Sequence, residues 1–323
     1  MGELRKVQQT PTGTFFICLP RDWAKEHNLQ KGSQVNLEAS TEGKLLVDTQ
    51  FDTEPQPKIV SLKVGPYLSR EIIGHYLLGY DIIRVETKGR IDSAVRNQIK
   101  STANSLAGLM IVEETTSMMA LQCLMQQPFT SPKKLLQRNQ GSAASMIRDA
   151  ASSFINRDTD MAQNVIERDV ENNRFYFLLV RILRTIIQNP RQGEKFEITP
   201  IECIDYRLAA SLIEDIGDVC VQIATTTLSL NDVKLSDEVR KLLSELQYVC
   251  FEANEQAFKS FLNKDISIAE NVRDMRAKIE ATSLEIEVVA KNSSVDLMPQ
   301  ILAVRSSLKQ IYECSVDMAD LVV

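Results

Sequence analysis

"SSFINRDTDMAQNV", residues 152–165, and "KSFLNKDISIAENV", residues 259–272, align without a gap. Seven of the fourteen positions are identical, and the two copies are offset by 107 residues. Each copy has the pattern of one amphipathic helix ending, a tight turn and a second helix beginning. Self-similarity at a fixed offset is typical of a duplicated structural unit. The stretch therefore predicts that the C-terminal part of the chain consists of two equivalent helical units.

Residues 131–323 have almost no strand pattern, and their apolar residues recur with helical spacing. Thr199 precedes a proline and lies three residues before Glu202, which is typical of a capping box at a helix start. We predict six long helices, over 131–156, 160–188, 200–230, 235–263, 266–292 and 296–322. They divide into two tandem three-helix bundles, about 131–230 and 235–323, which we expect to be related by a pseudo-two-fold axis.

The third helix of each unit carries two acids one turn apart. "IEDIGDVCVQIA", residues 213–224, contains Glu214 and Asp218, and the last helix contains Glu313 and Asp317 at an offset of 99. Side chains four apart lie on one face of a helix, where like charges cost roughly a few tenths of a kcal/mol. The flanking apolar residues point the other way, so we expect both pairs to face outward.

Two interpretations of these four acids are open at this point. They are either solvated surface charges or ligands that hold a cation on the surface of each unit. Their recurrence at matching positions favours a cation site. The scarcity of basic neighbours favours it too, because only Lys309 lies three or four residues from any of them. Carboxylate ligands suit hard or borderline cations.

Two smaller segments precede the helices. Residues 1–48 have the pattern strand, strand, short helix, strand, strand, and so short a unit has too thin a core to be stable alone. A polar stretch with two prolines, 49–57, is the predicted linker. Residues 58–127 alternate strand, helix, strand, helix, strand, which predicts a small α/β module with a structural or dimerisation role. Its glycines lack the spacing of a phosphate-binding loop.

Composition narrows the function classes. The chain has 323 residues, a formal charge of −6 and no apolar run long enough to span a membrane. The N-terminus lacks the apolar core of a signal peptide and the six cysteines form no CxxC pair, so we expect a cytoplasmic protein with free thiols. Two histidines leave little material for a zinc site or a catalytic triad. Residues 141–323 contain 20 basic and 29 acidic residues, which is unlike a nucleic-acid surface.

The stretch 213–224 resembles the "ERIGDHAVNIAE" signature of PhoU proteins, which regulate phosphate uptake, and the tandem three-helix units match that family. The resemblance covers about 131–323. It implies that a divalent or ferric ion (iron, zinc, magnesium or manganese) is bound by four residues: Glu214, Asp218, Glu313 and Asp317. It also implies docking to the ATPase of a phosphate ABC transporter.

The sequence departs from the PhoU pattern in places. Asp215 and Val219 stand where the signature has Arg and His, and the second copy lacks the glycine. Asp169 matches an acid that is usual in the second helix of the family, but its counterpart in the second unit is Arg276. The resemblance therefore leaves the occupancy of the second site open.

Residues 5–38 resemble a SpoVT/AbrB swapped-hairpin domain in their basic start, the turn at Gly13, the helix-opening Pro20 and an L-x-K-G segment. The resemblance implies a homodimer interlaced through this head. It also implies DNA binding by four basic residues: Arg5, Lys6, Arg21 and Lys25. Residues 1–50 contain six basic and six acidic residues, so phosphate neutralisation would be weak and a dimerisation-only role stays open.

An AbrB-like head, an α/β middle module and an all-α PhoU tail together resemble archaeal phosphate-uptake regulators. We expect a non-enzymatic regulator of phosphate uptake and phosphate homeostasis, acting through metal-dependent binding and through DNA binding by the head. The alternative is an AbrB-like transcription factor whose helical part only dimerises or docks a partner. A carboxylate-bridged metal enzyme is disfavoured, because the acids are expected to face outward and the chain lacks the Glu-x-x-His motif of di-iron bundles.

Overall fold

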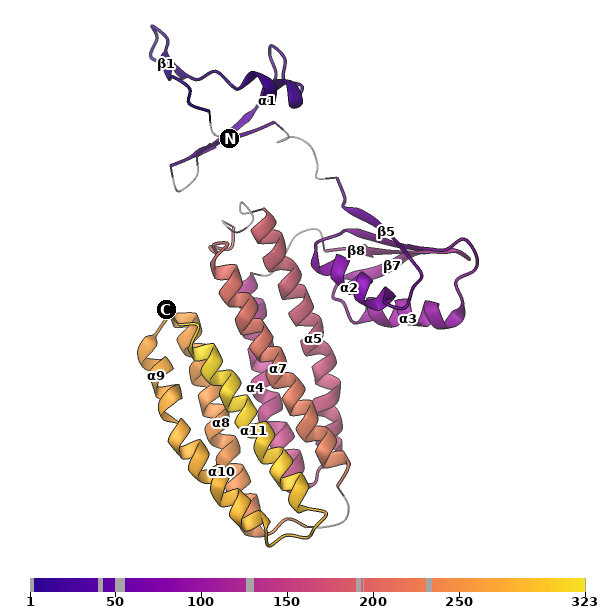
Figure 1. Ribbon diagram of the computed structural model, residues 1–323, viewed down its shortest axis with the longest axis vertical. Helices are drawn as coiled ribbons and strands as arrows, with labels where there is room; N and C mark the ends of the chain where they lie inside the picture. Colours follow the sequence, from indigo (N-terminus) through magenta and orange to yellow (C-terminus); the bar gives the residue numbers. More distant parts are fainter. Residues whose placement is uncertain are drawn as a thin grey trace. The chain divides into compact units, whose positions relative to one another are not determined.

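The structure is a computed structural model that describes residues 3–39, 43–49, 56–125, 131–189, 193, 195–230 and 234–322. The chain divides into two compact units, Met1–Gln56 and Pro57–Val323. The first unit is the head, and the second contains the α/β module and the helical tail (Figure 1). Most of the predicted linker, 49–57, lies outside the described residues.

The head has the predicted order of elements: β1 (Gln8–Gln9), β2 (Phe15–Phe16), α1 (Arg21–Glu26), β3 (Asn36–Ala39) and β4 (Leu45–Asp48). Strands β1 and β2 form one antiparallel hairpin, and β3 and β4 form another. Gly13 turns the first hairpin at φ +91°, a conformation that glycine adopts without strain. The predicted second turn includes Glu42, which lies outside the described residues.

None of the described residues of the head is buried. Large apolar side chains instead remain exposed on both hairpins and beside them: Val7, Phe15, Phe16, Ile17, Leu37, Leu45 and Leu46. A unit of this size needs a covered apolar surface to be stable. Within one chain, the head therefore has no hydrophobic core of its own among the residues described.

The α/β module contains β5 (Ile59–Lys63), α2 (Leu68–Leu77), β6 (Ile82–Glu86), α3 (Ser93–Asn104), β7 (Leu109–Glu114) and β8 (Met118–Cys123). The sheet order is β5-β6-β8-β7, with β5 and β6 parallel and the other pairs antiparallel. Helices α2 and α3 lie on the same side of the sheet (Figure 1). Strands β5, β6 and β7 lie where the sequence predicted them, whereas β8 was not predicted.

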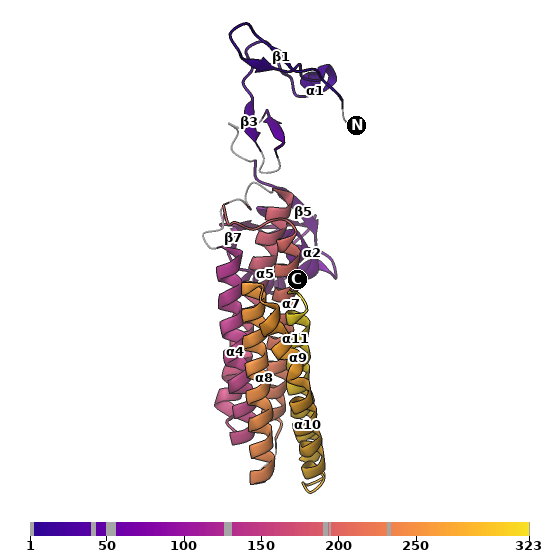
Figure 2. The same cartoon turned by 90° about the vertical axis from the view of Figure 1, so that its left-hand side faces the viewer.

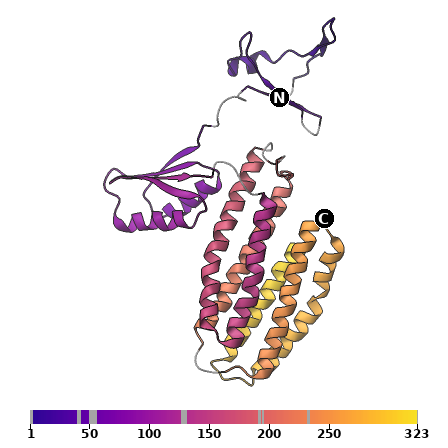
Figure 3. The same ribbon diagram turned by 180° about the vertical axis from the view of Figure 1, so that it is seen from behind.

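The helices of the tail run antiparallel to their neighbours in sequence, apart from one interrupted helix whose two parts follow each other in the same direction (Figures 1 and 2). Repeat one is α4 (Pro132–Asn156), α5 (Thr159–Gln188) and α7 (Glu202–Leu228). Repeat two is α8 (Asp237–Asn263), α9 (Ile266–Asp274), α10 (Arg276–Ala290) and α11 (Met298–Ala319). The two repeats meet where α4 lies beside α8 (Figure 3) and where α11 packs against α7. None of the described helices is both long enough and apolar enough to cross a membrane.

The two copies of the repeated sequence have the same local geometry. Arg157 and Lys264 end α4 and α8 in the left-handed conformation, with φ of 58° and 54°. The next residue in each copy, Asp158 or Asp265, caps the following helix by accepting backbone N–H bonds. The offset of 107 residues therefore relates equivalent structural positions as well as similar sequence.

The predicted helix 266–292 is wrong in one respect, because it is broken at Met275 into α9 and α10. At the break, the hydroxyl of buried Tyr312 donates to the carbonyl oxygens of Val272 and Arg273, at 3.1 and 3.3 Å. A side chain that inserts into the backbone hydrogen-bond ladder is a known cause of helix kinks. The kink thus has its origin in α11, in a residue distant in sequence.

Helix α5 joins the tail to the α/β module. Arg181, only 7% exposed, donates to the carbonyl oxygens of Tyr76 at 2.5 Å and Tyr80 at 3.0 Å. Its guanidinium also lies 5.0 Å from the centre of the Tyr76 ring. Leu77 and Phe177 pack against the cores of both parts. The module is therefore attached to the tail by a buried cation and by shared apolar packing.

Candidate metal centre

The repeat-one acids lie on α7, and the opposite face of this helix is packed against its neighbours. Ile213, Ile216 and Cys220 are fully buried, which places Asp218 on the exposed face and Glu214 at its partly buried edge. The expectation that the pair faces outward is thus confirmed for Asp218. Glu214 is only partly exposed, because α7 packs against α5 and α11 on either side.

A third acid approaches from α5. Asp169 is partly buried, and its Oδ2 accepts a hydrogen bond from Asn173 at 2.8 Å. Its Oδ1 has no partner, and neither amide atom of Asn172, 1% exposed, has one. Gly217 leaves room for these two side chains, because a Cβ there would lie 3.0 Å from Asp169 Oδ1 and 3.2 Å from Asn172 Nδ2. Repeat one therefore has a polar contact between α5 and α7, called the acid seam below. In this seam, Asp169 and Asn172 have buried atoms without hydrogen-bond partners.

The electrostatics of this seam disfavour ionised carboxylates without a counter-ion. Burial first, and then the carboxylates of Asp218, Asp215 and Asp169, raise the pKa of Glu214 to about 7. Burial and Asp218 likewise raise the pKa of Asp169 to about 6. The pKa of Asp215 is raised by burial and by Asp218. These shifts mark a concentration of negative charge that a cation would relieve.

Among the described residues, Arg207 is the cation that acts on Glu214, and its effect is small. Arg207 lowers the pKa of Glu214 only as the smallest of the contributions, and its guanidinium lies over the Tyr176 ring at 5.0 Å. Within the described part of the chain, Glu214, Asp215 and Asp218 have no salt bridge or side-chain hydrogen bond. The donor set of carboxylate and amide oxygens matches what hard cations prefer. The repeat-one residues thus fit a metal ion in chemistry and charge.

The side chains do not converge on a preformed site. Among the residues that the structure describes, no three His, Cys, Asp or Glu side chains lie close enough together to hold a metal. Carboxylates on an exposed helix face can change rotamer, so a metal would have to draw them together.

Repeat two differs from repeat one at the corresponding acids. Glu313 accepts hydrogen bonds from both terminal nitrogens of Arg276, at 2.9 Å each, while Asp317 is exposed. Lys309, the basic neighbour noted in the sequence, pairs with Glu280 instead of Glu313. The partner of Glu313 is therefore a residue of α10, which the spacing along its own helix could not reveal. The repeat-two acids do not fit a metal as well as those of repeat one.

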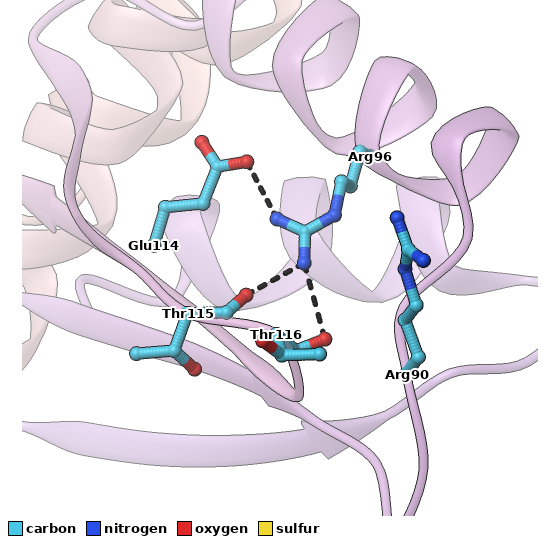
Figure 4. Close-up of a pocket in the computed structure, with 5 residues that line it drawn as sticks. All are labelled: Arg90, Arg96, Glu114, Thr115 and Thr116. Carbon is cyan, nitrogen blue, oxygen red and sulfur yellow. Dashed lines mark hydrogen bonds and ion pairs between the residues drawn. The ribbon is translucent and has the colours of Figure 1, made fainter.

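A hollow in the α/β module is lined by Arg90, Arg96, Glu114, Thr115 and Thr116 (Figure 4). Arg96 points into the β7–β8 turn and donates to Glu114 and to the carbonyl oxygens of Thr115 and Thr116. Its Nε donates to the carbonyl oxygen of Ile91. Because these groups already occupy its donors, Arg96 fixes the turn in place and is poorly suited to bind an anion.

The four basic residues predicted for DNA binding all lie on the exposed surface of the head. Arg21 and Lys25 belong to α1, at its start and near its end. Arg5 forms a salt bridge with Glu3 at 2.8 Å, which reduces its free charge. The head presents Lys6, Arg21 and Lys25 without such an ion pair among the described residues.

Fold and acid seam together define the tail as a tandem three-helix protein with an E-x-x-x-D helix in each repeat. Residues 137–227, which make up most of repeat one, match the PhoU domain family. The fold resembles the crystal structure of PhoU from Pseudomonas aeruginosa, with a TM-score of 0.52 and 18% identity over 59% of this chain and 93% of that one.

It also resembles the phosphate transport system regulatory protein PhoU from Streptococcus pneumoniae, with a TM-score of 0.51 and 14% identity over 59% of this chain and 91% of that one. None of the curated proteins compared with the chain matches it. The tail therefore contains a PhoU domain within a PhoU-like fold, as the sequence resemblance indicated. The matches to solved structures cover the helical fold and do not bear on the AbrB resemblance of the head.

Proposed function

We propose that this chain is a non-enzymatic regulator of phosphate uptake that acts by binding a metal ion on its PhoU tail. The single observation that carries the proposal is the acid seam of repeat one. Glu214 and Asp218 on α7 and Asp169 on α5 concentrate negative charge there without a salt bridge among the described residues, inside the segment that matches the PhoU domain. The phosphate transport system protein that shares the fold supports the biological context.

Glu214 and Asp218 of α7 would hold the ion, with Asp169 from α5 as the third carboxylate. When bound, an ion with oxygen ligands keeps open coordination positions that a phosphate group can fill. Asp215 adds negative charge at the edge of the seam. Gly217 allows the two helices to approach closely enough for the acids to act together.

Binding of Mn²⁺ to the full chain, measured by equilibrium dialysis and elemental analysis, tests this proposal. We expect the double variant Glu214→Gln, Asp218→Asn to lose the ion bound by the unaltered chain. Glu171→Gln is the matched control, because Glu171 is an exposed acid on α5 just outside the seam. Equal Mn²⁺ binding by the double variant and the unaltered chain would overturn the site assignment.

We propose further that the regulated partner is the ATPase of a phosphate ABC transporter, as the resemblance to PhoU proteins suggests. The acidic seam gives such an interaction a route to depend on bound metal. Binding of the purified ATPase should therefore be weaker for the double variant than for the Glu171→Gln control. Equal binding by both would separate partner docking from the metal site.

We also propose that the chain is a homodimer paired through its head. In the β3–β4 hairpin, Leu37 lies opposite Val47 and Ala39 lies opposite Leu45, so these four side chains share one face. Leu37 and Leu45 are 57% and 58% exposed, and a second head would cover them. Leu37→Asp with Leu45→Asp should yield a monomer in analytical ultracentrifugation. Leu4→Asp, at a fully exposed position, should remain dimeric.

DNA binding by the head is the second candidate function, supported by the exposed basic residues on and before α1. If it holds, the affinity for promoter DNA falls with salt and falls further in Arg21→Ala, Lys25→Ala. A salt-dependent shift that persists in this variant would place the DNA contact elsewhere. DNA binding that neither phosphate nor metal affects would favour the alternative of an AbrB-like transcription factor whose helical part only dimerises or docks a partner.

A further inference from the structure

The residues that approach the E-x-x-x-D helices of the two repeats have opposite charge at one equivalent position. In repeat one, α5 brings Asp169 toward α7, and the residue at the offset of 107 in repeat two is Arg276. The matching helix corners at Arg157 and Lys264 show that this offset relates equivalent places in the structure. An acid that adds to the carboxylate seam in one repeat is thus exchanged for a cation in the other.

Arg276 binds Glu313 in the geometry that a guanidinium prefers for a carboxylate. Nη1 to Oε1 and Nη2 to Oε2 are both 2.9 Å, so both carboxylate oxygens are occupied. The guanidinium also lies 5.4 Å from the centre of the Tyr312 ring. One turn earlier, Arg273 donates to Asp320, the C-cap residue of α11, with Nε at 3.0 Å from Oδ1. Two arginines therefore neutralise the side of repeat two that faces α11.

Repeat two also has apolar side chains where repeat one has the asparagine and the glycine of the acid seam. The counterpart of Asn172 is Ile279, and the counterpart of Gly217 is Val316 at the offset of 99. Both are buried apolar residues, 1% and 9% exposed. The unsatisfied polar seam of repeat one is therefore replaced in repeat two by apolar contact and an ion pair.

A metal at repeat two would have to displace the guanidinium from both oxygens of Glu313. Without that displacement, Asp317 is the remaining carboxylate of the pair on α11, and one carboxylate is a weak site for a hard cation. Displacement would also leave Arg276 beside the new positive charge, which like-charge repulsion disfavours. The arginine thus performs in repeat two the charge neutralisation that repeat one leaves to an external ion.

We propose that Arg276 is the built-in cation of repeat two, so that each chain binds a metal at the repeat-one seam alone. Arg276 is then the residue that decides metal stoichiometry. The repeat-one half of this statement rests on the proposed function, whereas the role of Arg276 rests on its own contacts.

The test is Mn²⁺ stoichiometry in the full chain, read from free Mn²⁺ by electron paramagnetic resonance. We expect one ion per chain for the unaltered protein, and the same with less than a twofold change in Kd for Glu313→Gln, Asp317→Asn. Arg276→Asp should add a second, weaker ion, and that ion should disappear when Glu313→Gln is added. Arg276→Lys keeps a positive charge and should not add an ion.

Two ions in the unaltered chain, with one lost in Glu313→Gln, Asp317→Asn, would overturn the inference. An unchanged stoichiometry in folded Arg276→Asp would also overturn it. If the unaltered chain binds no Mn²⁺ while Arg276→Asp binds one, the repeat-one metal site fails and the role of Arg276 stands. Should Arg276→Asp fail to fold, the comparison of the unaltered chain with Glu313→Gln, Asp317→Asn still decides the question.

Discussion

Single residues decide how closely α5 and α7 approach each other at the acid seam. Gly217 is buried where the two helices meet, and its missing side chain leaves room for Asp169 and Asn172. Both of these neighbours have buried atoms without hydrogen-bond partners. The seam is therefore a place where the chain retains polar groups at a cost in stability, which is common at functional sites.

Gly217→Val should destabilise the tail by about 1–3 kcal/mol, because the new side chain meets Asp169 Oδ1 and Asn172 Nδ2 at once. Gly141→Val is the matched control, since Gly141 is an exposed helical position with nothing within 4 Å of a new Cβ. It should change stability by less than about 0.5 kcal/mol. Urea unfolding followed by circular dichroism measures both. Equal effects would contradict the close approach at Gly217.

At the scale of elements, the start of α7 links the two repeats. Thr199 and Glu202 form the predicted capping box, with Thr199 N donating to Glu202 Oε2 at 3.0 Å and Glu202 N donating to Thr199 Oγ1 at 3.3 Å. The other oxygen of Glu202 accepts from Lys264 Nζ at 2.8 Å, at the corner that ends α8. These bonds, that from Lys264 first, lower the pKa of Glu202 to about 2.

A lowered pKa in the folded state means that the ionised carboxylate favours folding. This contribution is fully present above the ordinary pKa of 4.5 and is lost as the pH falls toward about 2. Glu202→Gln should therefore lower the free energy of unfolding by about 1 kcal/mol at pH 7. The difference between the variant and the unaltered chain should shrink below pH 4.5 and vanish near pH 2. A difference that is constant over this range would exclude the carboxylate as its source.

Much of this level of structure could be predicted from the sequence, because helical spacing and caps are local. Five of the six long helices lie within a few residues of their predicted ranges, and the predicted capping box of Thr199 and Glu202 forms. Strand β8 was missed because "MMALQC" does not alternate between apolar and polar residues, Gln122 being its single polar residue, and most of it is buried. The break at Met275 and the Arg276–Glu313 pair depend on α11, so no local pattern could reveal them.

At the scale of the whole molecule, Arg181 holds the α/β module against the tail. It occupies α5, the helix that also contributes Asp169 to the acid seam. A buried arginine bound to two carbonyl oxygens is stable only while both parts stay in contact. The sequence alone predicted the module and the helices, but not this contact, because no motif joins residues a hundred positions apart.

Arg181→Met should loosen the contact between the module and the tail, because the carbonyl oxygens of Tyr76 and Tyr80 lose the guanidinium as a donor. We expect a loss of about 2–3 kcal/mol and faster amide hydrogen exchange at the end of α2, with the tail helices unchanged. Arg184→Met, an exposed position on the same helix, serves as the control. Faster exchange throughout the tail would contradict a local attachment.

A head that buries none of its described residues within one chain makes its folding a question of concentration. Paired as proposed, its native state is the product of a second-order reaction, so a tenfold dilution lowers the stability of the pair by about 1.4 kcal/mol. The concentration of paired heads then rises with the square of protein abundance while pairs are rare, and the paired fraction rises in proportion to abundance. Any activity that requires a paired head would be scarce at low expression and would increase steeply as the protein accumulates.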